Sequence, residues 1–330
     1  MPVRRSPPAV SGSAWIVTGP LILALCFVFA VGGLSEQTSA WQPSAGHVQV
    51  PIWPGAAPDA QPVTGPETST KTQGEDLVAG KPYIYIENVS RPTMTVYSPG
   101  GKNTGVAVIV FPGGGYEGLA IDLEGTEVCA WLTSKGITCV LLKYRVPHSG
   151  PQYDDKCKCQ VKPKAPMALQ DAQRAMGLIR LHAAEHHIDP HKIGVLGFSA
   201  GGHLVADIST HFDKRVYSPV DVADQESCRP DFAVALYPGH LRNGQALSPD
   251  ISVTRQTPPA FLLHAENDSV DNAYNSVVYY LALMYAGVPA ELHLYAEGKH
   301  GFGLRRTQYP ITRWPELVET WLRTIGVTSK

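Results

Sequence analysis

The sequence predicts an α/β fold in three layers, with helices on both faces of a mostly parallel sheet. From about residue 105 onward, short apolar runs alternate with longer segments of helical periodicity, which is the pattern of strand–helix–strand units. Several runs are continuously apolar, as in strands that are buried on both faces of a parallel sheet. A chain of 330 residues is long enough to form such a sheet within one domain.

Residues 1–40 are expected to be a signal peptide or an N-terminal membrane anchor. Arg4 and Arg5 precede an uncharged, mostly apolar stretch over residues 14–33, and Thr38-Ser39-Ala40 offers small residues for cleavage before Trp41. The stretch is also long enough to span a bilayer if it is retained. We therefore expect export to the periplasm or the medium, with anchoring by the uncleaved segment as the alternative. No other contact with a membrane is expected.

Residues 41–80 are rich in Pro, Gly, Ser and Thr and have little periodicity, so they predict an extended arm or linker. Within them, residues 48–53 are expected to form a strand or a docking segment. The main domain is expected over residues 81–330. Its strands are expected at 83–86, 94–97, 106–111, 137–142, 192–196, 232–237, 259–264 and 290–295. Its helices are expected at 122–135, 167–187, 202–208, 272–286 and 314–325. A polar insertion is expected at 146–164 and a loop-rich excursion at 238–258.

Net charge and cysteine content bear on nucleic-acid binding, disulfide pairing and metal binding. The net charge of −2 gives no basic footprint for nucleic acid. Five cysteines remain outside the signal segment, and an odd number leaves at least one unpaired within a monomer. Cys129 and Cys139 lie in apolar stretches and are expected to be ordinary core residues. Cys157, Cys159 and Cys228 lie in polar loops, and this group is expected to supply one disulfide. Two cysteines in a C-x-C pair provide too few ligands for a metal site.

The pentapeptide Gly197-Phe198-Ser199-Ala200-Gly201 stands between a strand-like run and a helix-like run. A serine on such a sharp turn has its hydroxyl exposed above the sheet, and the glycines on either side avoid collisions with neighbouring backbone. The turn also brings the backbone N–H of Ala200 and the positive end of the new helix beside an oxyanion formed at Ser199. We therefore expect Ser199 to be a nucleophile.

A serine nucleophile needs a base, and the base needs a carboxylate that orients it. Asp268 follows the run 259–264 and His300 follows the run 290–295, so the order is Ser, Asp, His, with each residue after a strand. The carboxyl ends of parallel strands meet at one edge of a sheet. Glu266 and Asp271 are nearby rivals of Asp268. Among the other histidines, His264 is expected to bond to backbone at a strand end. His182 and His186 have metal-ligand spacing, but a solvated helix end is the simpler expectation.

The run Pro112-Gly113-Gly114-Gly115-Tyr116 follows the strand expected at 106–111. Three glycines allow backbone N–H groups to turn toward a developing negative charge without obstruction by side chains. We assign Gly114, Gly115 and Ala200 to an oxyanion hole. A phosphate-binding loop is the alternative, but the sequence after the run lacks the usual phosphate-binding motifs. Tyr116, Tyr144 and Tyr237 are expected to line the substrate pocket.

Over roughly residues 48–326, the chain resembles the bacterial α/β-hydrolase esterases of the acetyl-xylan-esterase-like group. The resemblance rests on the order and spacing of short motifs, namely Pro51-Ile52-Trp53-Pro54-Gly55, Pro112-Gly113-Gly114-Gly115-Tyr116, Asp122-Leu123-Glu124-Gly125, Leu142-Lys143-Tyr144-Arg145, Asp171-Ala172-Gln173-Arg174-Ala175, Gly197-Phe198-Ser199-Ala200-Gly201-Gly202-His203-Leu204 and Gly298-Lys299-His300-Gly301-Phe302. It departs from the group in the insertion with Cys157 and Cys159, and Pro112 stands where hormone-sensitive-lipase relatives carry His.

This resemblance implies hydrolysis of carboxylic esters, often of acetyl or hydroxycinnamoyl groups on plant polysaccharide, by Ser199, His300 and Asp268. The expected partner is a small-molecule or carbohydrate ester, and no cofactor or metal is expected. A peptidase or amidase with the same fold and triad is one alternative. A non-catalytic exported binding module is another, and it would tolerate the loss of any triad member.

Overall fold

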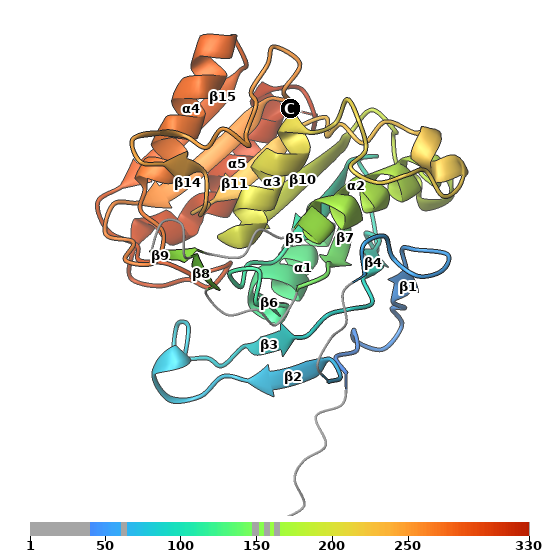
Figure 1. Cartoon of the computed structure of the whole chain (residues 1–330), viewed down its shortest axis with the longest axis horizontal. Helices are drawn as coiled ribbons and strands as arrows, with labels where there is room; N and C mark the ends of the chain where they lie inside the picture. Colours follow the sequence, from blue (N-terminus) through green and yellow to red (C-terminus); the bar gives the residue numbers. More distant parts are fainter. Residues whose placement is uncertain (1–39, 61–64, 147–151, 155–158, 162–165, 330) are drawn as a thin grey trace, which may run out of the picture. The chain divides into compact units, whose positions relative to one another are not determined.

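Eight strands of the described residues form the central sheet, in the order β1-β4-β7-β5-β10-β11-β14-β15 (Figure 1). The computed structural model describes residues 40–60, 65–146, 152–154, 159–161 and 166–329. β4 runs antiparallel to both of its neighbours, and the six strands from β7 to β15 are parallel. The strands span Val50–Pro51 (β1), Thr93–Tyr97 (β4), Thr138–Lys143 (β7), Ala107–Phe111 (β5), Ile193–Phe198 (β10), Ala233–Leu236 (β11), Ala260–Ala265 (β14) and Ala290–Tyr295 (β15).

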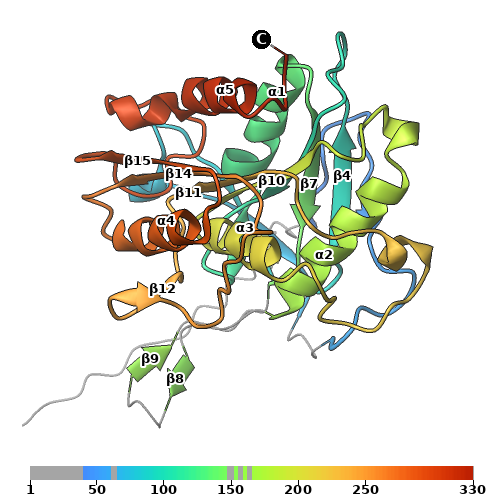
Figure 2. The same ribbon diagram turned by 90° about the horizontal axis from the view of Figure 1, so that it is seen from above.

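Helices cover both faces of the sheet. Figure 2 shows α1 and α5 on one face and α2, α3 and α4 on the other. Their bounds are Glu127–Ser134 (α1), Pro166–Leu181 (α2), Ala200–Thr210 (α3), Tyr274–Ala286 (α4) and Trp314–Thr324 (α5). Trp131 of α1 packs edge to face on Trp314 of α5, with ring centroids 5.1 Å apart. The predicted three-layer α/β architecture is therefore confirmed.

The apolar runs of the sequence form the strands that these two helical layers bury. Every residue of β5, β7, β10, β11 and β14 is buried. β15 lies at the edge of the sheet and is mostly half-buried, and its sequence mixes polar with apolar residues. Continuous apolar runs thus form the central strands of the sheet, and the run of mixed polarity forms the edge strand β15.

Smaller elements lie outside the main sheet. Thr68–Lys71 (β2), Ile84–Glu87 (β3) and Gly118–Ala120 (β6) form a three-stranded antiparallel sheet. Arg242–Asn243 (β12) pairs with Ala246–Leu247 (β13), and within the polar insertion Gln152–Asp154 (β8) pairs with Cys159–Val161 (β9). Short 3-10 helices span Gly74–Asp76, Ala184–His186, Val222–Gln225 and Pro310–Arg313.

Two predicted helices have different bounds in the structure. The segment predicted at 122–135 opens with a π-helical turn, Asp122–Thr126, before α1 begins. The helix predicted at 167–187 ends at Leu181, and a 3-10 turn follows. His187 then takes a left-handed conformation with φ of 54°, and Ile188 after it is buried. The left-handed residue ends the helical turns, and the N–H of Ile188 donates back to the carbonyl oxygen of Ala183 at 2.8 Å.

Residues 41–80, predicted as an arm or linker, pack onto the main domain through much of their length. β1 pairs with β4, and β2 pairs with β3. Trp53 is buried, its Nε1 donates to Asp171 Oδ1 at 2.8 Å, and the guanidinium groups of Arg145 and Arg174 lie over its ring at 5.9 and 5.6 Å from the centroid. The described residues from Ala40 onward accordingly belong to one compact unit.

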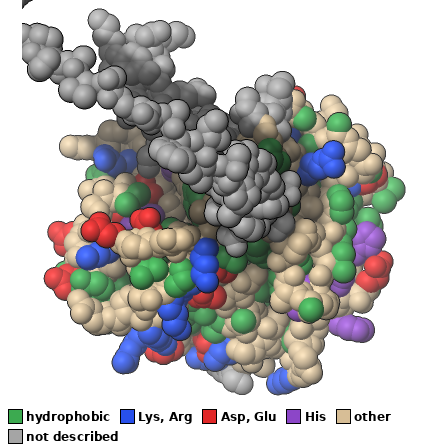
Figure 3. Space-filling view, turned by 90° about the horizontal axis from the view of Figure 1, so that it is seen from below, with side chains coloured by type: hydrophobic (Ala, Val, Ile, Leu, Met, Phe, Trp, Pro, Cys, Tyr) green, Lys and Arg blue, Asp and Glu red, His purple; other side chains and the backbone are tan. Residues whose placement is uncertain are grey.

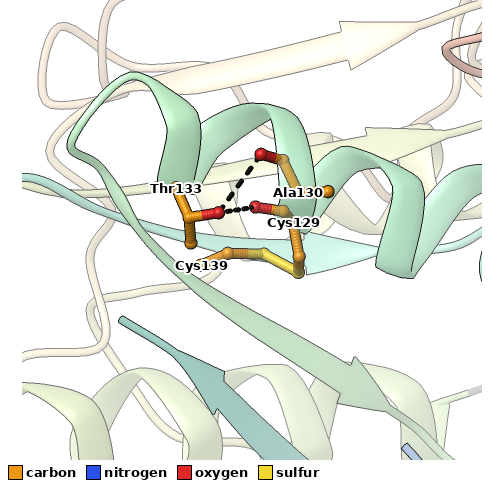
Figure 4. The surroundings of a disulfide bond; sticks show 4 residues. All are labelled: Cys129, Ala130, Thr133 and Cys139. Atoms are coloured by element: carbon orange, nitrogen blue, oxygen red, sulfur yellow. Dashed lines mark hydrogen bonds between the residues drawn. A yellow bond between two sulfur atoms is a disulfide. The ribbon is translucent and has the colours of Figure 1, made fainter. Parts of the chain in front are cut away.

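The prediction that Cys129 and Cys139 are ordinary core residues was wrong in one respect, because they are buried but bonded to each other. Cys129 of α1 and Cys139 of β7 form a disulfide, with Cα atoms 5.1 Å apart (Figure 4). Cys228, one of the three cysteines expected to supply a disulfide, is buried with a free thiol that contacts the carbonyl oxygen of Phe212 at 3.4 Å. Both bonded cysteines are fully buried, so sequence hydrophobicity alone does not separate them from ordinary core residues. Cys157 and the side chain of Cys159 lie outside the described residues.

The predicted signal or anchor segment also lies outside the described residues, except for Ala40. Across the residues that the structure does describe, no helix combines the length and the apolar character needed to cross a membrane.

On the face seen in Figure 3, Lys and Arg side chains are interspersed with Asp and Glu, in keeping with the small net charge of −2.

Candidate active site

Ser199 stands at a tight turn between β10 and α3. Its backbone has φ of 52° and ψ of −118°, a strained conformation for a residue with a side chain. A Cβ atom at Gly201 would lie 2.0 Å from the carbonyl oxygen of Phe111, and one at Gly197 would lie 2.2 Å from the carbonyl oxygen of Gly201. Both flanking positions therefore require glycine, because the turn brings neighbouring backbone into contact with them.

His300 lies between Ser199 and Asp268. Its Nε2 is 2.9 Å from Ser199 Oγ, and its Nδ1 is 2.6 Å from Asp268 Oδ2. The three residues follow β10, β14 and β15, whose carboxyl ends lie along one edge of the sheet. The side-chain amide of Asn267 accepts hydrogen bonds from the N–H groups of Gly298 and Lys299, at 2.9 Å each, and so joins the two loops. The structure brings together the three residues that the sequence selects.

Several donors hold the carboxylate of Asp268. The backbone N–H groups of Val270 and Asp271 donate to its Oδ1 at 2.8 and 2.9 Å, and His264 Nε2 lies 3.3 Å from its Oδ2. Burial opposes ionisation of Asp268, but hydrogen bonds from His264 and His300 outweigh it and lower its pKa below the usual range. Asp268 is therefore ionised beside the imidazole.

The pKa of His300 moves in the opposite direction. Burial favours the neutral ring, but the hydrogen bond and negative charge of Asp268, with further contributions from Asp271 and Glu124, raise the pKa of His300 above its ordinary value. An imidazolium at this position is thus stabilised by surrounding carboxylates. This is the charge state that a base reaches when it takes a proton from a hydroxyl.

His264 supports the site from the preceding strand. Its Nε2 donates to the carbonyl oxygen of Asp271 at 2.9 Å, and its Nδ1 lies 2.8 Å from Ser276 Oγ. The prediction that His264 bonds to backbone at a strand end is confirmed. His182, on the other hand, is an exposed residue that contacts Glu185 at 2.8 Å. In the described part of the chain, no group of three or more His, Cys, Asp or Glu is arranged to hold a metal ion.

The two rivals of Asp268 occupy different positions. Glu266 is exposed on the same loop. Asp271 is nearly buried, and its Oδ2 lies 3.4 Å from Ser199 Oγ and 4.0 Å from His300 Nε2. Asp271 therefore faces the reacting side of the imidazole, whereas Asp268 binds the opposite ring nitrogen.

The glycine run after β5 is held in a fixed conformation. Gly114 has φ of 140°, and a Cβ there would lie 2.1 Å from the carbonyl oxygen of Gly118. The Tyr85 hydroxyl donates to the carbonyl oxygen of Gly114 at 3.0 Å. Gly114 and Gly115 both line the cleft beside Ser199. Ala200 is the first residue of α3, a position whose N–H has no acceptor within the helix.

Glu124, in the π-helical turn, fixes the start of the same loop. Its Oε2 accepts a hydrogen bond from the N–H of Gly113 at 2.7 Å, and its Oε1 accepts one from the Tyr237 hydroxyl at 2.8 Å. Burial raises the pKa of Glu124, although these two hydrogen bonds oppose the shift. No role was predicted for Glu124 from the sequence. An acidic residue between apolar neighbours in Asp122-Leu123-Glu124-Gly125 was the available signal.

The cleft at Ser199 has a volume of about 210 Å³. Tyr83 and Tyr85 from the β3 region, His240 and Val270 contribute to its lining, together with Asp271. None of these was assigned to the pocket from sequence, although the Tyr83-x-Tyr85 alternation places both rings on one face of a strand.

The three tyrosines expected to line the pocket are buried, and none of them is among the residues that line the cleft. Their hydroxyls have partners inside the protein. Tyr116 bonds to His203 Nδ1 at 2.7 Å, Tyr144 donates to the carbonyl oxygen of Pro112 at 2.5 Å, and Tyr237 donates to Glu124. They support the loops around Ser199 instead of facing the cleft.

Comparison with known proteins gives three related results. The BD-FAE family model matches residues 94–238. An acetylxylan esterase from Xylanibacter ruminicola is 30% identical over 225 residues, which cover 61% of this chain and 42% of that protein. An endo-1,4-beta-xylanase B from Butyrivibrio fibrisolvens is 27% identical over 61% of this chain and 33% of that protein. The chain thus spans less than half the length of these curated relatives.

Among solved structures, an acetyl ester-xyloside bifunctional hydrolase from Caldicellulosiruptor lactoaceticus is similar over nearly its whole length. It is 32% identical, with a TM-score of 0.65, and the match covers 86% of this chain and 97% of that one. An α/β hydrolase from a deep-sea metagenome, 24% identical with a TM-score of 0.57 over 78% of this chain and 98% of that one, shares the fold.

Proposed function

This chain belongs to the α/β-hydrolase esterases of the acetyl-xylan-esterase type, and on that premise we propose that it hydrolyses short-chain acyl esters through an acyl-enzyme. The observation that carries the proposal is the continuous chain of hydrogen bonds from Asp268 through His300 to Ser199, at 2.6 and 2.9 Å. This arrangement matches what activation of a serine hydroxyl requires.

In the proposed reaction, Ser199 Oγ attacks the ester carbonyl while His300 Nε2 takes its proton. Asp268 keeps the Nδ1 proton of His300 directed away from the serine and stabilises the imidazolium that forms. His300 then gives the proton to the departing alcohol. A water molecule, deprotonated by His300, attacks the acyl-enzyme and releases the acid.

The N–H groups of Gly114, Gly115 and Ala200 are proposed to bind the oxyanion of both tetrahedral intermediates. Two observations support this role. The left-handed backbone of the glycine run is fixed by Glu124 and Tyr85, and the start of α3 adds the positive end of its helix dipole. Donors that are fixed before the reaction need no reorganisation when the charge develops.

The proposed substrates carry acetyl groups on plant polysaccharide or oligosaccharide. The names of the similar proteins support this substrate class, since two of them are an acetylxylan esterase and an acetyl ester-xyloside hydrolase. The cleft volume of about 210 Å³ also favours a small acyl group over a hydroxycinnamoyl group, because pockets for larger ligands usually exceed about 300 Å³.

The Ser199→Ala variant tests the mechanism. Hydrolysis of p-nitrophenyl acetate by this variant should fall by at least about 1,000-fold, because the acyl-enzyme no longer forms. A melting curve that matches the wild-type curve would show that the loss is chemical. Activity close to that of the wild type would contradict the assignment.

We also propose that the protein is exported. The uncharged apolar segment after Arg4 and Arg5 is typical of a signal peptide. The disulfide between Cys129 and Cys139 supports the same conclusion, because disulfides persist mainly in oxidising compartments such as the periplasm and the extracellular medium.

A further inference from the structure

A second carboxylate, that of Asp271, lies beside the reacting atoms of the proposed active site. Its Oδ2 lies 3.4 Å from Ser199 Oγ and 4.0 Å from His300 Nε2. Asp271 also lines the cleft that opens on Ser199. The proposed mechanism does not use this carboxylate, because Asp268 already orients His300 from the other ring nitrogen.

The surrounding structure fixes Asp271 in this position. Its backbone N–H donates to Asp268 Oδ1 at 2.9 Å, and its carbonyl oxygen accepts a hydrogen bond from His264 Nε2 at 2.9 Å. Gly239 leaves the space for the side chain, because a Cβ at that position would lie 2.5 Å from Asp271 Oδ2. The backbone of Asp271 is therefore fixed on both sides, and the space left by Gly239 accommodates its carboxylate.

We propose that Asp271 determines specificity by selecting neutral esters and discriminating against esters that carry a carboxylate close to the scissile bond. This inference rests on the proposed function. Any acyl or alcohol group bonded to the carbonyl carbon must lie within a few ångströms of Ser199 Oγ, and therefore near Asp271. Two negative charges at such distances in a partly buried cleft repel each other strongly. The expected substrates are thus neutral acylated sugars. Uronic acids that carry the acyl group on a hydroxyl next to their carboxylate are expected to be poor substrates.

Two pairs of substrates of matched size measure the discrimination against anionic esters and show whether it acts on the acyl side or the alcohol side. For the acyl side, p-nitrophenyl butyrate is compared with mono-p-nitrophenyl succinate, in which a carboxylate replaces the terminal methyl group of the acyl chain. For the alcohol side, acetoxyacetamide is compared with acetoxyacetate. The quantity measured for each pair is the ratio of kcat/KM for the anionic ester to kcat/KM for the neutral one, so a general loss of activity cancels.

In the Asp271→Asn variant this ratio should rise at least about tenfold for one pair or both, because the repelling charge is removed while the shape of the side chain is kept. Asp271→Ser is the second variant, for use if the amide impairs folding. Glu266→Gln is the matched control, because it removes one negative charge from an exposed position on the same loop. Its ratios should match those of the wild type.

Ratios that stay within twofold of the wild-type values for both pairs and both Asp271 variants would overturn the specificity proposal while leaving the esterase proposal intact. A wild-type enzyme that does not hydrolyse p-nitrophenyl butyrate, or a Ser199→Ala variant that does, would instead contradict the proposed function and with it this inference. Higher salt should reduce the discrimination by the wild type, because it screens the repulsion.

Discussion

At the scale of single residues, the main feature is the concentration of carboxylates around one imidazole. Asp268 lies 2.6 Å from His300 Nδ1 and Asp271 lies 4.0 Å from Nε2, while Glu124 contributes from the π-helical turn Asp122–Thr126. Burial alone would make the imidazolium unfavourable. Because the carboxylates outweigh burial, the charge that forms during the proposed reaction is stabilised before the substrate arrives.

A pH profile follows from this balance. His300 must be neutral to accept the serine proton, and its pKa is raised above the ordinary value of 6.5. The value of kcat/KM should therefore fall on acidification with a midpoint above 6.5, and activity should be retained as the pH rises from there. Asp268, whose pKa is lowered, stays ionised across this range. The measurement is kcat/KM for p-nitrophenyl acetate between about pH 5 and about pH 9.

The Asp271→Asn variant is the matched comparison for this profile. Removal of a negative charge 4.0 Å from Nε2 destabilises the imidazolium, so the acid midpoint should move to lower pH. A wild-type midpoint below 6.5 would mean that burial dominates, and this would contradict the expected raised pKa.

Sequence reasoning selected Ser199, Asp268 and His300 because each follows an apolar run, and the ends of parallel strands meet along one edge of a sheet. Glu124 and the cleft position of Asp271 could not be found in this way. Their surroundings consist of residues far away in the sequence, such as Tyr237 for Glu124 and Gly239 for Asp271. Tyr116 was expected to line the pocket because it follows the glycine run, but its ring is buried in the core. Proximity to a motif does not decide whether a ring faces the cleft or the core.

At the scale of elements, the disulfide ties α1 to β7, the strand that follows it in the chain. The two elements are joined by the turn through Gly136, whose φ of 75° suits a residue without a side chain. α1 itself continues directly from the π-helical turn that carries Glu124. The disulfide thus braces the helix that leads away from the proposed oxyanion loop.

Removal of this disulfide by Cys129→Ala with Cys139→Ala should lower the free energy of unfolding by about 2.7 kcal/mol. The value follows from the entropy that a loop with a sequence separation of 10 regains in the unfolded chain, and loss of buried sulfur adds to it. Urea unfolding of the wild type and the double variant measures the difference. Reductant should destabilise the wild type and leave the double variant unchanged, and a wild type that is insensitive to reductant in the unfolded state would contradict the pairing.

The elements themselves were predicted best where the sequence pattern was long. The strands that form the centre of the sheet were found to within a few residues, because burial on both faces demands continuous apolar sequence. The π-helical turn at Asp122–Thr126 was read as ordinary helix, since its composition is compatible with either form. β2 was missed because Thr68–Lys71 pairs with a small outer sheet and is half exposed, so no apolar run marks it.

At the scale of the whole molecule, a buried network joins the N-terminal segment to the main domain. Asp171 of α2 accepts hydrogen bonds from Trp53 and from the Arg145 side chain, and Arg174 donates to the carbonyl oxygen of Ile52. Burial raises the pKa of Asp171, although the charge of Arg145 opposes that shift. Residues 41–80 appear linker-like by composition but are part of the folded unit, because strand pairing with the main domain and the buried Trp53 attach them to it.

The N-terminal limit of the folded unit, near residue 40, leads to a prediction about signal cleavage. The described part of the compact unit begins at Ala40, Trp41 is buried, and the carbonyl oxygen of Trp41 accepts a hydrogen bond from Gln49 Nε2 at 2.9 Å. Cleavage after Ala40 would leave this unit nearly complete. Protein recovered from the periplasm or the medium should therefore have Trp41 as its first residue, as determined by N-terminal sequencing and intact mass.

Ala40→Phe should block this cleavage, because the processing enzyme requires a small residue before the cut. Ala45→Phe is the matched control, since Ala45 is exposed and lies beyond the cleavage site, and it should be processed like the wild type. Recovery of the wild type only from the membrane fraction, with residues 1–40 still attached, would favour the retained anchor. The disulfide supports the proposal of export, but it does not show whether residues 1–40 are removed. The Ala40→Phe and Ala45→Phe variants distinguish cleavage from anchoring without reference to the disulfide.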